Sequence, residues 1–446
     1  MKVEEIQAQF QFECQPEATR YIEEVVKSAV AQSTFLQQLE KELMEITSTK
    51  LFDWIDHIEV GLRNGLAEMG FQQEGATRLS RIFHHPKAQL PRVVVRDDTT
   101  PFIKIGINID SCADFLMVRG LKRSIVGSPE LRRAEVVREN GVSVSIIERR
   151  AGWQMEPSNT MIDTAWAKEK WQTRRRQGGD EEDLLHEAML IAEELVAKLG
   201  TGLAASIVCQ VEREYWQTRN TAGQIQKARQ DRLGMGWANH DHHTFRASRT
   251  HFHSTCRLFE ILGFRCRERF YAGLEAGWGA QVMEHPETRL VLFVDVDLSP
   301  EELSIDFSRE ELVTREKLGT IGLWCALHGE SLLQAGMHHL EAQFVFEKLA
   351  HDLNESGVAM MPPFSNFPHL KQAFTQGEVW KVAKNRIDML LQKGLITESL
   401  AEQFLTKGAI GSHLENLERH DGFKGFNQKA VSDIIRRTDP RGSFGA

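Results

Sequence analysis

The chain has 446 residues, which is enough for two or three ordinary domains, and its 41% hydrophobic and 26% charged residues are typical of a soluble globular protein. The formal net charge of −9 argues against a general nucleic-acid binder, and six scattered cysteines without a C-x-x-C pair argue against a disulfide framework or a zinc–thiolate site. The first residues lack the apolar stretch of a signal peptide, and about 18 consecutive apolar residues occur nowhere, so we expect a cytoplasmic protein.

The first half of the chain alternates predicted helices with predicted strands. Residues 16–48 and 160–230 have helical periodicity, and Gly200 can cap the amphipathic helix that precedes it. Between them, we expect strands at 51–60, 102–110 and 113–120 and a helix at 61–71. The basic run 174–176 is followed at once by four acidic residues, which is typical of a solvated loop.

The second half repeats a strand–helix–strand pattern. We expect a strand at 238–248, a helix at 248–264 and strands at 265–271, 277–284 and 288–298. A strand at 335–344, a helix at 345–357 and a closing strand at 409–419 follow, with an inserted helical stretch at 384–408. A histidine on the opening strand marks three such units, at His57, His242 and His339. The absence of a G-x-G-x-x-G after a strand argues against a Rossmann sheet.

Alternation of side chains along a strand selects the residues that can converge. His242 shares a strand face with His240, Thr244 and Arg246, His339 shares one with Glu341 and Gln343, and Glu415 shares one with His413, Leu417 and Arg419. Two histidines and one carboxylate from three strands can form a facial triad that leaves three positions open on iron(II). Arg246 can then present its guanidinium to a substrate carboxylate.

Each of these residues also has an ordinary structural explanation. A strand histidine is more often a core or surface residue than a ligand. Glu415 can pair with Arg419 on a solvated strand, and Arg246 can be half of a structural ion pair. Three other residues are candidates for roles near the metal. His240 could support a metal ligand, and His413 could orient a ligand or the substrate. Glu378 could replace Glu415 as the carboxylate ligand.

A family resemblance favours the metal interpretation. The segments DHHTFRAS, GMHHLEAQF and HLENLERHDGFKGFNQKAVSDI resemble the 2-oxoadipate dioxygenase/decarboxylase family, over about residues 235–440. The family has three signatures. The first is met by Asp241-His242 and Phe245-Arg246, the second by His339, and the third by Glu415 and Glu418-Arg419. The resemblance implies a vicinal oxygen chelate fold, Fe(2+) held by His242, His339 and Glu415, and Arg246 on the substrate carboxylate.

The same resemblance implies a reaction and its partners. Family membership implies oxidative decarboxylation of 2-oxoadipate to 2-hydroxyglutarate, a step of lysine catabolism. The expected partners are a small 2-oxo acid and dioxygen, with no nucleic acid and no membrane; a homo-oligomer is left open. Alternatives are an extradiol dioxygenase, a glyoxalase-type isomerase with another carboxylate and fewer open positions, or a non-catalytic small-molecule binding protein.

The expected fold class is α+β, with repeated βαβββ units forming a curved mixed sheet around the metal site. We predict an N-terminal helical segment (1–50), a degenerate chelate-like unit (51–150), a helical connector (151–234) and a metal-binding catalytic domain (235–446). In the degenerate unit Gly61 stands where the arginine is expected, and His57 is a structural histidine in the simplest interpretation.

Overall fold

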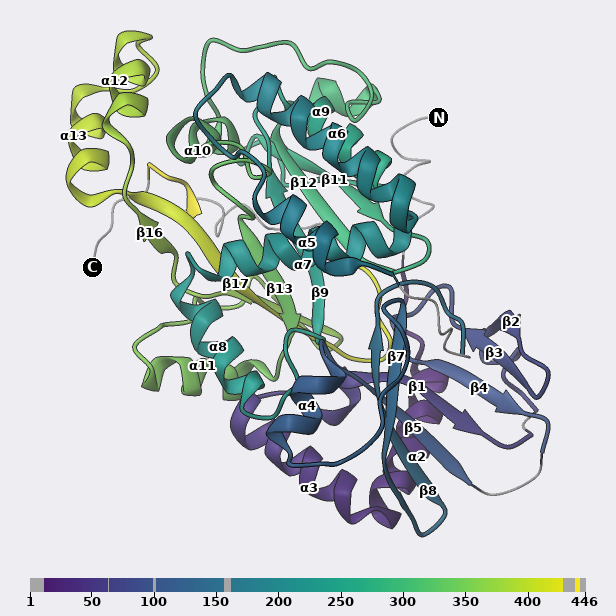
Figure 1. Cartoon of the computed structure of the whole chain (residues 1–446). Coiled ribbons are helices and arrows are strands. Elements are labelled where there is room, and N and C mark those ends of the chain that lie inside the picture. Colours follow the sequence, from purple (N-terminus) through teal and green to yellow (C-terminus); the bar gives the residue numbers. More distant parts are fainter. Residues whose placement is uncertain (1–11, 63, 99–101, 156–161, 428–437, 442–446) are drawn as a thin grey trace.

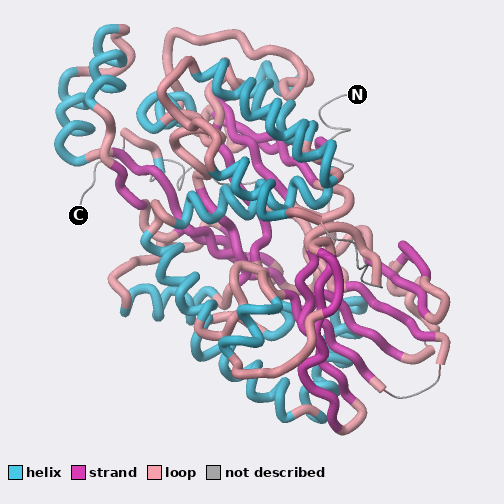
Figure 2. Tube along the Cα trace, viewed as in Figure 1, coloured by secondary structure: helices cyan, strands magenta, loops and turns pink. Residues whose placement is uncertain are grey.

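The computed structural model describes residues 12–62, 64–98, 102–155, 162–427 and 438–441. Two mixed β-sheets dominate it, one from each half of the chain, and helices cover one face of each sheet (Figures 1 and 2). No helix among these described residues is long and apolar enough to cross a membrane.

The N-terminal sheet has eight strands in the order β2-β3-β4-β1-β5-β8-β7-β6. Its strands are β1 (Ile55–Val60), β2 (Gln72–Ala76), β3 (Ser80–His84), β4 (Arg92–Arg96), β5 (Ile103–Asn108), β6 (Val126–Ser128), β7 (Leu131–Glu139) and β8 (Val142–Arg149). Helices α2 (Pro16–Gln32), α3 (Thr34–Glu42) and α4 (Cys112–Val118) pack on it, together with the short helices η1 (Leu43–Thr47) and η2 (Leu51–Trp54).

The C-terminal sheet has the corresponding order β10-β11-β12-β9-β13-β17-β15-β14. Its strands are β9 (His240–Arg246), β10 (Arg265–Tyr271), β11 (Trp278–Glu284), β12 (Val291–Asp297), β13 (His339–Gln343), β14 (Ser365–Phe367), β15 (Leu370–Phe374) and β17 (Ala409–Arg419), and β16 (Glu378–Trp380) pairs with β17. The remaining helices are α5 (Thr164–Gln172), α6 (Glu181–Leu199), α7 (Thr201–Gln217), α8 (Thr221–Asp231), α9 (Phe252–Ile261), η3 (Pro300–Ser304), α10 (Thr320–His328), α11 (Phe346–Glu355), α12 (Lys384–Gln392) and α13 (Glu398–Lys407).

The strand order resolves into four repeats, two in each sheet: three are βαβββ units and the first has turns in place of the helix, and this is the vicinal oxygen chelate architecture. In the C-terminal sheet one unit is β9-α9-β10-β11-β12, and the next is β13-α11-β14-β15-β17 with α12 and α13 inserted. In the N-terminal sheet β5-α4-β6-β7-β8 is a complete unit, whereas β1 is followed by turns before β2. The sequence pattern predicted three units, and the one that begins at β5 was missed.

Two element predictions in this region are wrong. Residues 61–62 and 64–71 form bends and turns instead of the expected helix, because Gly65 and Gly70 adopt φ values of +91° and +88°, which end helical geometry. Residues 113–120 were expected to be a strand, but Cys112–Val118 is helix α4, capped by the Ser111 side chain, which accepts from the Asp114 backbone N–H.

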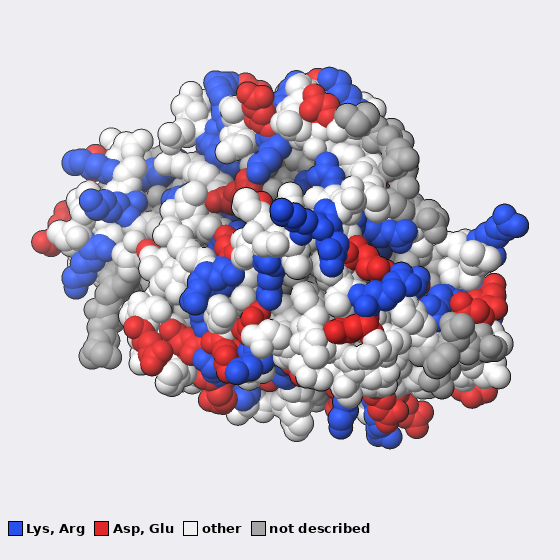
Figure 3. Space-filling model, turned by 60° about the horizontal axis from the view of Figure 1, so that its bottom comes forward, with Lys and Arg blue, Asp and Glu red and all other residues white. Residues whose placement is uncertain are grey.

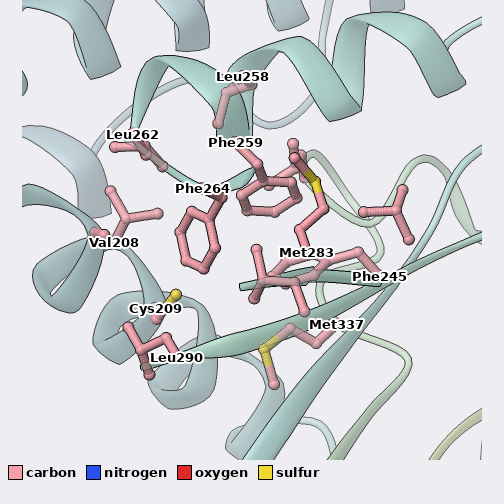
Figure 4. Packing of buried hydrophobic residues seen from close by; sticks show 14 of the residues in the cluster. Val208, Cys209, Phe245, Leu258, Phe259, Leu262, Phe264, Met283, Leu290 and Met337 are labelled. Atoms are coloured by element: carbon pink, nitrogen blue, oxygen red, sulfur yellow. The ribbon is translucent and has the colours of Figure 1, made fainter. Parts of the chain in front are cut away.

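The largest core lies between the C-terminal sheet and helices α6, α7 and α9. Phe245 on β9 packs against Phe259 on α9, with ring centroids 4.9 Å apart, and Met283 on β11 lies beside them (Figure 4). Leu340 on β13 and Leu414 on β17 belong to the same core. Since neighbours along a strand alternate, the side chains adjacent to these apolar residues project from the opposite face of the sheet.

The predicted solvated loop at 174–183 is only partly solvated. The side chain of Arg174 is buried and that of Arg176 is largely covered. Both pair with Glu212, at 2.7 and 2.9 Å from its Oε1, while Arg175 pairs with Glu187 at the surface. The acidic partner that decides this burial lies on α7, far along the sequence from the arginine run. Elsewhere at the surface, charges of both signs are interspersed over the face shown in Figure 3.

Candidate metal centre

The three central strands of the C-terminal sheet align the candidate ligands in two rows. β9 pairs antiparallel with β13, and β13 pairs parallel with β17. The register places His242, Glu341 and Glu415 side by side in one row, and it places Thr244, His339 and His413 in the next. Residues paired across strands project to the same side of a sheet, so both rows face away from the helices.

The structure brings His242, His339 and Glu415 together. One potential ligand atom from each lies within 4.8 Å of the others, and all three side chains are buried. The Nε2 atom of His339 is 2.9 Å from Oε2 of Glu415. Two ligand atoms at right angles on an ion, each about 2.1 Å from it, lie roughly 3.0 Å apart. The donor set and its spacing therefore fit a divalent cation such as iron(II).

Glu341 is a fourth side chain at the centre, and the sequence pattern predicted no role for it. It is fully buried, and its Oε2 lies 2.9 Å from Nε2 of His242. Strand alternation had already put Glu341 on the face of His339. Only the register shows that it stands between His242 and Glu415.

A β-bulge supports His242 from outside the centre. β9 has one extra residue, Asp241, between the residues that pair with β13. Asp241 accepts from Nδ1 of His242 at 3.4 Å, and Arg419 donates to Asp241 from Nε and Nη2, both at 3.2 Å. Arg419 also donates to two backbone carbonyls of the following loop. This chain of contacts fixes the His242 ring with Nε2 toward the centre.

The other ligand candidates also have supporting contacts. Gln372 on β15 donates from Nε2 to Oε1 of Glu415 at 3.2 Å. Nδ1 of His339 is 3.0 Å from Nδ1 of His338. When Nδ1–H of His339 is the donor in this contact, its Nε2 lone pair is free for a cation.

Burial perturbs ionisation throughout the centre. Burial and the charge of Glu415 raise the pKa of Glu341 to about 8, and burial raises the pKa of Glu415 to about 7 despite His242 nearby. Burial disfavours a charged His242, but the carboxylates of Glu341 and Asp241 outweigh it and raise the His242 pKa to about 10. A cation that binds here therefore competes with protons for these groups.

Arg246 lies in the same cavity as the ligand candidates. The cavity has a volume of about 70 Å³ and is lined by His242, His339, Glu341 and Glu415, and by Arg246 with Asp295. Arg246 is the fourth residue after His242 on β9, which places their Cα atoms roughly 13 Å apart. Nε of Arg246 is 3.8 Å from Asp295, and neither Nε nor Nη1 has a hydrogen-bond partner among the described residues. Arg246 therefore offers N–H donors to a bound anion.

Three other candidates lie outside this cavity. His413 is buried between the rings of His338 and Phe374, and its Nδ1 contacts the Thr375 carbonyl at 3.2 Å. The Asp241 bulge reverses strand alternation before His242, so His240 lines a different cavity, of about 270 Å³, between the two sheets. Glu378 accepts from the backbone N–H and the hydroxyl of Thr221 instead of facing the centre.

The N-terminal sheet repeats the supporting contacts around His57. β1 has its own bulge at Asp56, whose Oδ2 is 2.6 Å from Nδ1 of His57. Arg149 at the end of β8 donates to Asp56 from Nε and Nη2, at 2.9 and 3.0 Å, and from Nη1 to two loop carbonyls. These contacts therefore match, one for one, the contacts among Arg419, Asp241 and His242.

The N-terminal sheet does not repeat the other ligand candidates. His57 pairs with Gly106, and Gly106 pairs with Ser145. By the same register Gly106 corresponds to Glu341, and Ser145 corresponds to Glu415. Lys104 stands in the position of His339, and its ammonium is 2.7 Å from Glu59. His57 is therefore a structural counterpart of His242, without a carboxylate at the two positions where the C-terminal sheet has one.

No protein-family model matches the sequence, and no curated protein matches it. Among solved structures, a triple mutant of 4-hydroxymandelate synthase from Streptomyces coelicolor matches with 12% identity and a TM-score of 0.29, over 86% of this chain and 98% of that chain. Methylmalonyl-CoA epimerase from Mycobacterium tuberculosis matches with 11% identity and a TM-score of 0.23, over 41% of this chain and 89% of that chain. TM-scores this low carry no weight alone, and the fold class rests on the strand order and pairing.

Proposed function

We propose that the protein is an iron(II)-dependent dioxygenase that decarboxylates a 2-oxo acid, with a 2-oxoadipate-like dicarboxylate as substrate and a 2-hydroxyglutarate-like product. In this proposal His242, His339 and Glu415 hold the ion. The observation that carries it is the convergence of these three buried side chains within 4.8 Å, in one cavity with Arg246.

The atom balance of the proposed reaction is simple. A 2-oxo acid and one dioxygen molecule give carbon dioxide and a hydroxy acid one carbon shorter. A bound iron(II) ion would supply the electrons and the Lewis acidity for oxygen chemistry. The protein would supply binding, orientation and a dry site.

Arg246 has the proposed role of receiving the remote carboxylate of the substrate. Its position along β9 would let the 2-oxo acid end of the substrate reach the ion while the other end meets the guanidinium. Phe270, Phe293, Phe374 and Phe426 also line the cavity and would exclude water from the reacting end.

The test is anaerobic reconstitution of the purified protein with iron(II), followed by a screen of 2-oxo acids. We expect oxygen consumption matched by carbon dioxide release, largest for a dicarboxylic substrate, and neither in the metal-free protein. Oxygen uptake that is absent for every 2-oxo acid, in protein that holds iron, would refute the proposal.

A metal-dependent isomerase of the glyoxalase type is the second candidate function. The observation that favours it is Glu341, because a second carboxylate at the ion would leave fewer open positions. An isomerase would turn over its substrate without oxygen and would retain activity with a redox-inert divalent ion. The same reconstitution under nitrogen, with zinc in a parallel sample, separates the two functions.

A further inference from the structure

We propose that Glu341 is a fourth protein ligand of the metal centre, so that the resting ion is held by two histidines and two glutamates. This inference rests on the proposed metal site and extends it beyond the set His242, His339 and Glu415. It does not depend on which substrate the centre serves.

The orientation of His242 is the first reason. Its Nδ1 contacts Asp241, so in the neutral ring Nδ1 carries the proton and Nε2 presents a lone pair. That lone pair lies 2.9 Å from a carboxylate oxygen of Glu341. In the metal-free protein a proton occupies this contact, and a divalent cation can take its place between the two atoms, bound by both.

The geometry of the contact is the second reason. The close polar contact of Glu341 is to another ligand candidate, because its Oε2 lies 2.9 Å from His242 Nε2. The contact has the same 2.9 Å length as that between His339 Nε2 and Glu415 Oε2. Both lengths match the roughly 3.0 Å spacing of neighbouring ligand atoms around one ion.

Charge balance is the third reason. Glu341 is fully buried, and the row that contains it has a second carboxylate, Glu415. Two ionised carboxylates buried side by side are strongly disfavoured unless a cation compensates them. A single divalent ion neutralises both, while both histidines stay neutral as ligands must.

The N-terminal sheet supports the assignment independently. It retains the Arg149–Asp56–His57 contacts but has Lys104 for His339 and Ser145 for Glu415. At the position of Glu341 it has Gly106. Between the two sheets, the supporting contacts are the same, but the residues at the positions of His339, Glu415 and Glu341 all differ. This is expected if Glu341 belongs to the set of metal ligands.

Four protein ligands would leave two positions on a six-coordinate ion, enough for the two oxygens of a chelating 2-oxo acid. An oxygenase would need a third position, so one protein ligand would have to leave. Glu415 is anchored by the hydrogen bond from Gln372 on β15, whereas the polar contact of Glu341 is to His242 inside the centre. Glu341 is therefore the ligand that can leave at the lower cost.

The experiment is a titration of the metal-free protein with cobalt(II), read by visible absorption, for the parent and for Glu341→Ala and Glu341→Gln. Removal of a supporting group costs metal sites 10–100-fold in affinity. We expect Glu341→Ala to lose more than about 100-fold and to change the cobalt absorption bands. Circular dichroism and urea unfolding confirm that each variant is folded.

Two further variants make the outcome unambiguous. Glu59→Gln removes a buried carboxylate from β1 of the N-terminal sheet, and it should bind cobalt like the parent. Glu415→Ala tests the proposed centre itself. If Glu415→Ala abolishes binding while both Glu341 variants keep the parent affinity and spectrum, only this inference is overturned. If Glu415→Ala also binds like the parent, the proposed metal site is overturned.

Discussion

Replacement of Arg419 by methionine should weaken both folding and metal binding. The guanidinium donates twice to the buried Asp241 and twice to loop carbonyls, and Asp241 in turn holds the His242 ring. In Arg419→Met the Asp241 carboxylate stays buried without its cation. Loss of one partner from a buried pair costs about 3–5 kcal/mol of unfolding free energy.

The metal affinity should fall because His242 loses its orientation. Loss of a group that orients a ligand weakens metal binding about 10–100-fold, which is roughly 1.4–2.8 kcal/mol. Urea unfolding of the metal-free protein measures the first effect. Cobalt(II) titration, under conditions where circular dichroism shows native protein, measures the second.

The chain contains its own control in Arg149, which makes the same contacts to Asp56 and to two loop carbonyls in the N-terminal sheet. Arg149→Met should lose a similar unfolding free energy and leave the cobalt affinity unchanged. Equal loss of metal affinity in both variants, or parent-like affinity in Arg419→Met, would refute the reasoning.

Three other predictions concern single side chains. Glu415→Ala should abolish turnover and tight metal binding but keep the fold, because burial raises the pKa of this carboxyl to about 7 and its charge does not stabilise the metal-free protein; metal content and circular dichroism check this. Arg246→Met should raise KM for dicarboxylic 2-oxo acids roughly 10–100-fold, the value of a charge-assisted hydrogen bond, while KM for a monocarboxylic 2-oxo acid stays near that of the parent. Burial opposes the charge of Glu418, but His420 and other hydrogen-bond donors outweigh it and lower its pKa from 4.5 to about 2. Its contribution to stability should be complete above pH 4.5 and be lost as the pH falls through 2, so urea midpoints of Glu418→Gln should depend less on pH in this range than those of the parent.

Local pattern was sufficient for most elements of the C-terminal half. The strands β9 to β13 and β17, and the helices α9, α11, α12 and α13, lie where periodicity predicted them, within a few residues. The N-terminal half was harder. Phe115 and Leu116 are consecutive buried residues on a short helix, and two apolar neighbours do not distinguish a helix from a strand.

Strand alternation was informative within a strand and misleading across a bulge. It put His242, Thr244 and Arg246 on one face, and all three line the cavity. It also put His240 on that face, which is wrong because Asp241 is an extra residue in β9. A bulge is a feature of strand pairing, so alternation along one strand cannot reveal it.

The sequence by itself determined which side chains can bind a cation and on which strands they stand, because residue type and a period of two are local properties. The tertiary structure alone decided that Glu341 stands between His242 and Glu415, that Arg419 reaches Asp241, and that Lys104 takes the place of His339 in the N-terminal sheet. These relations depend on register between strands far apart in the chain, and register is set by the packing of the whole sheet against its helices.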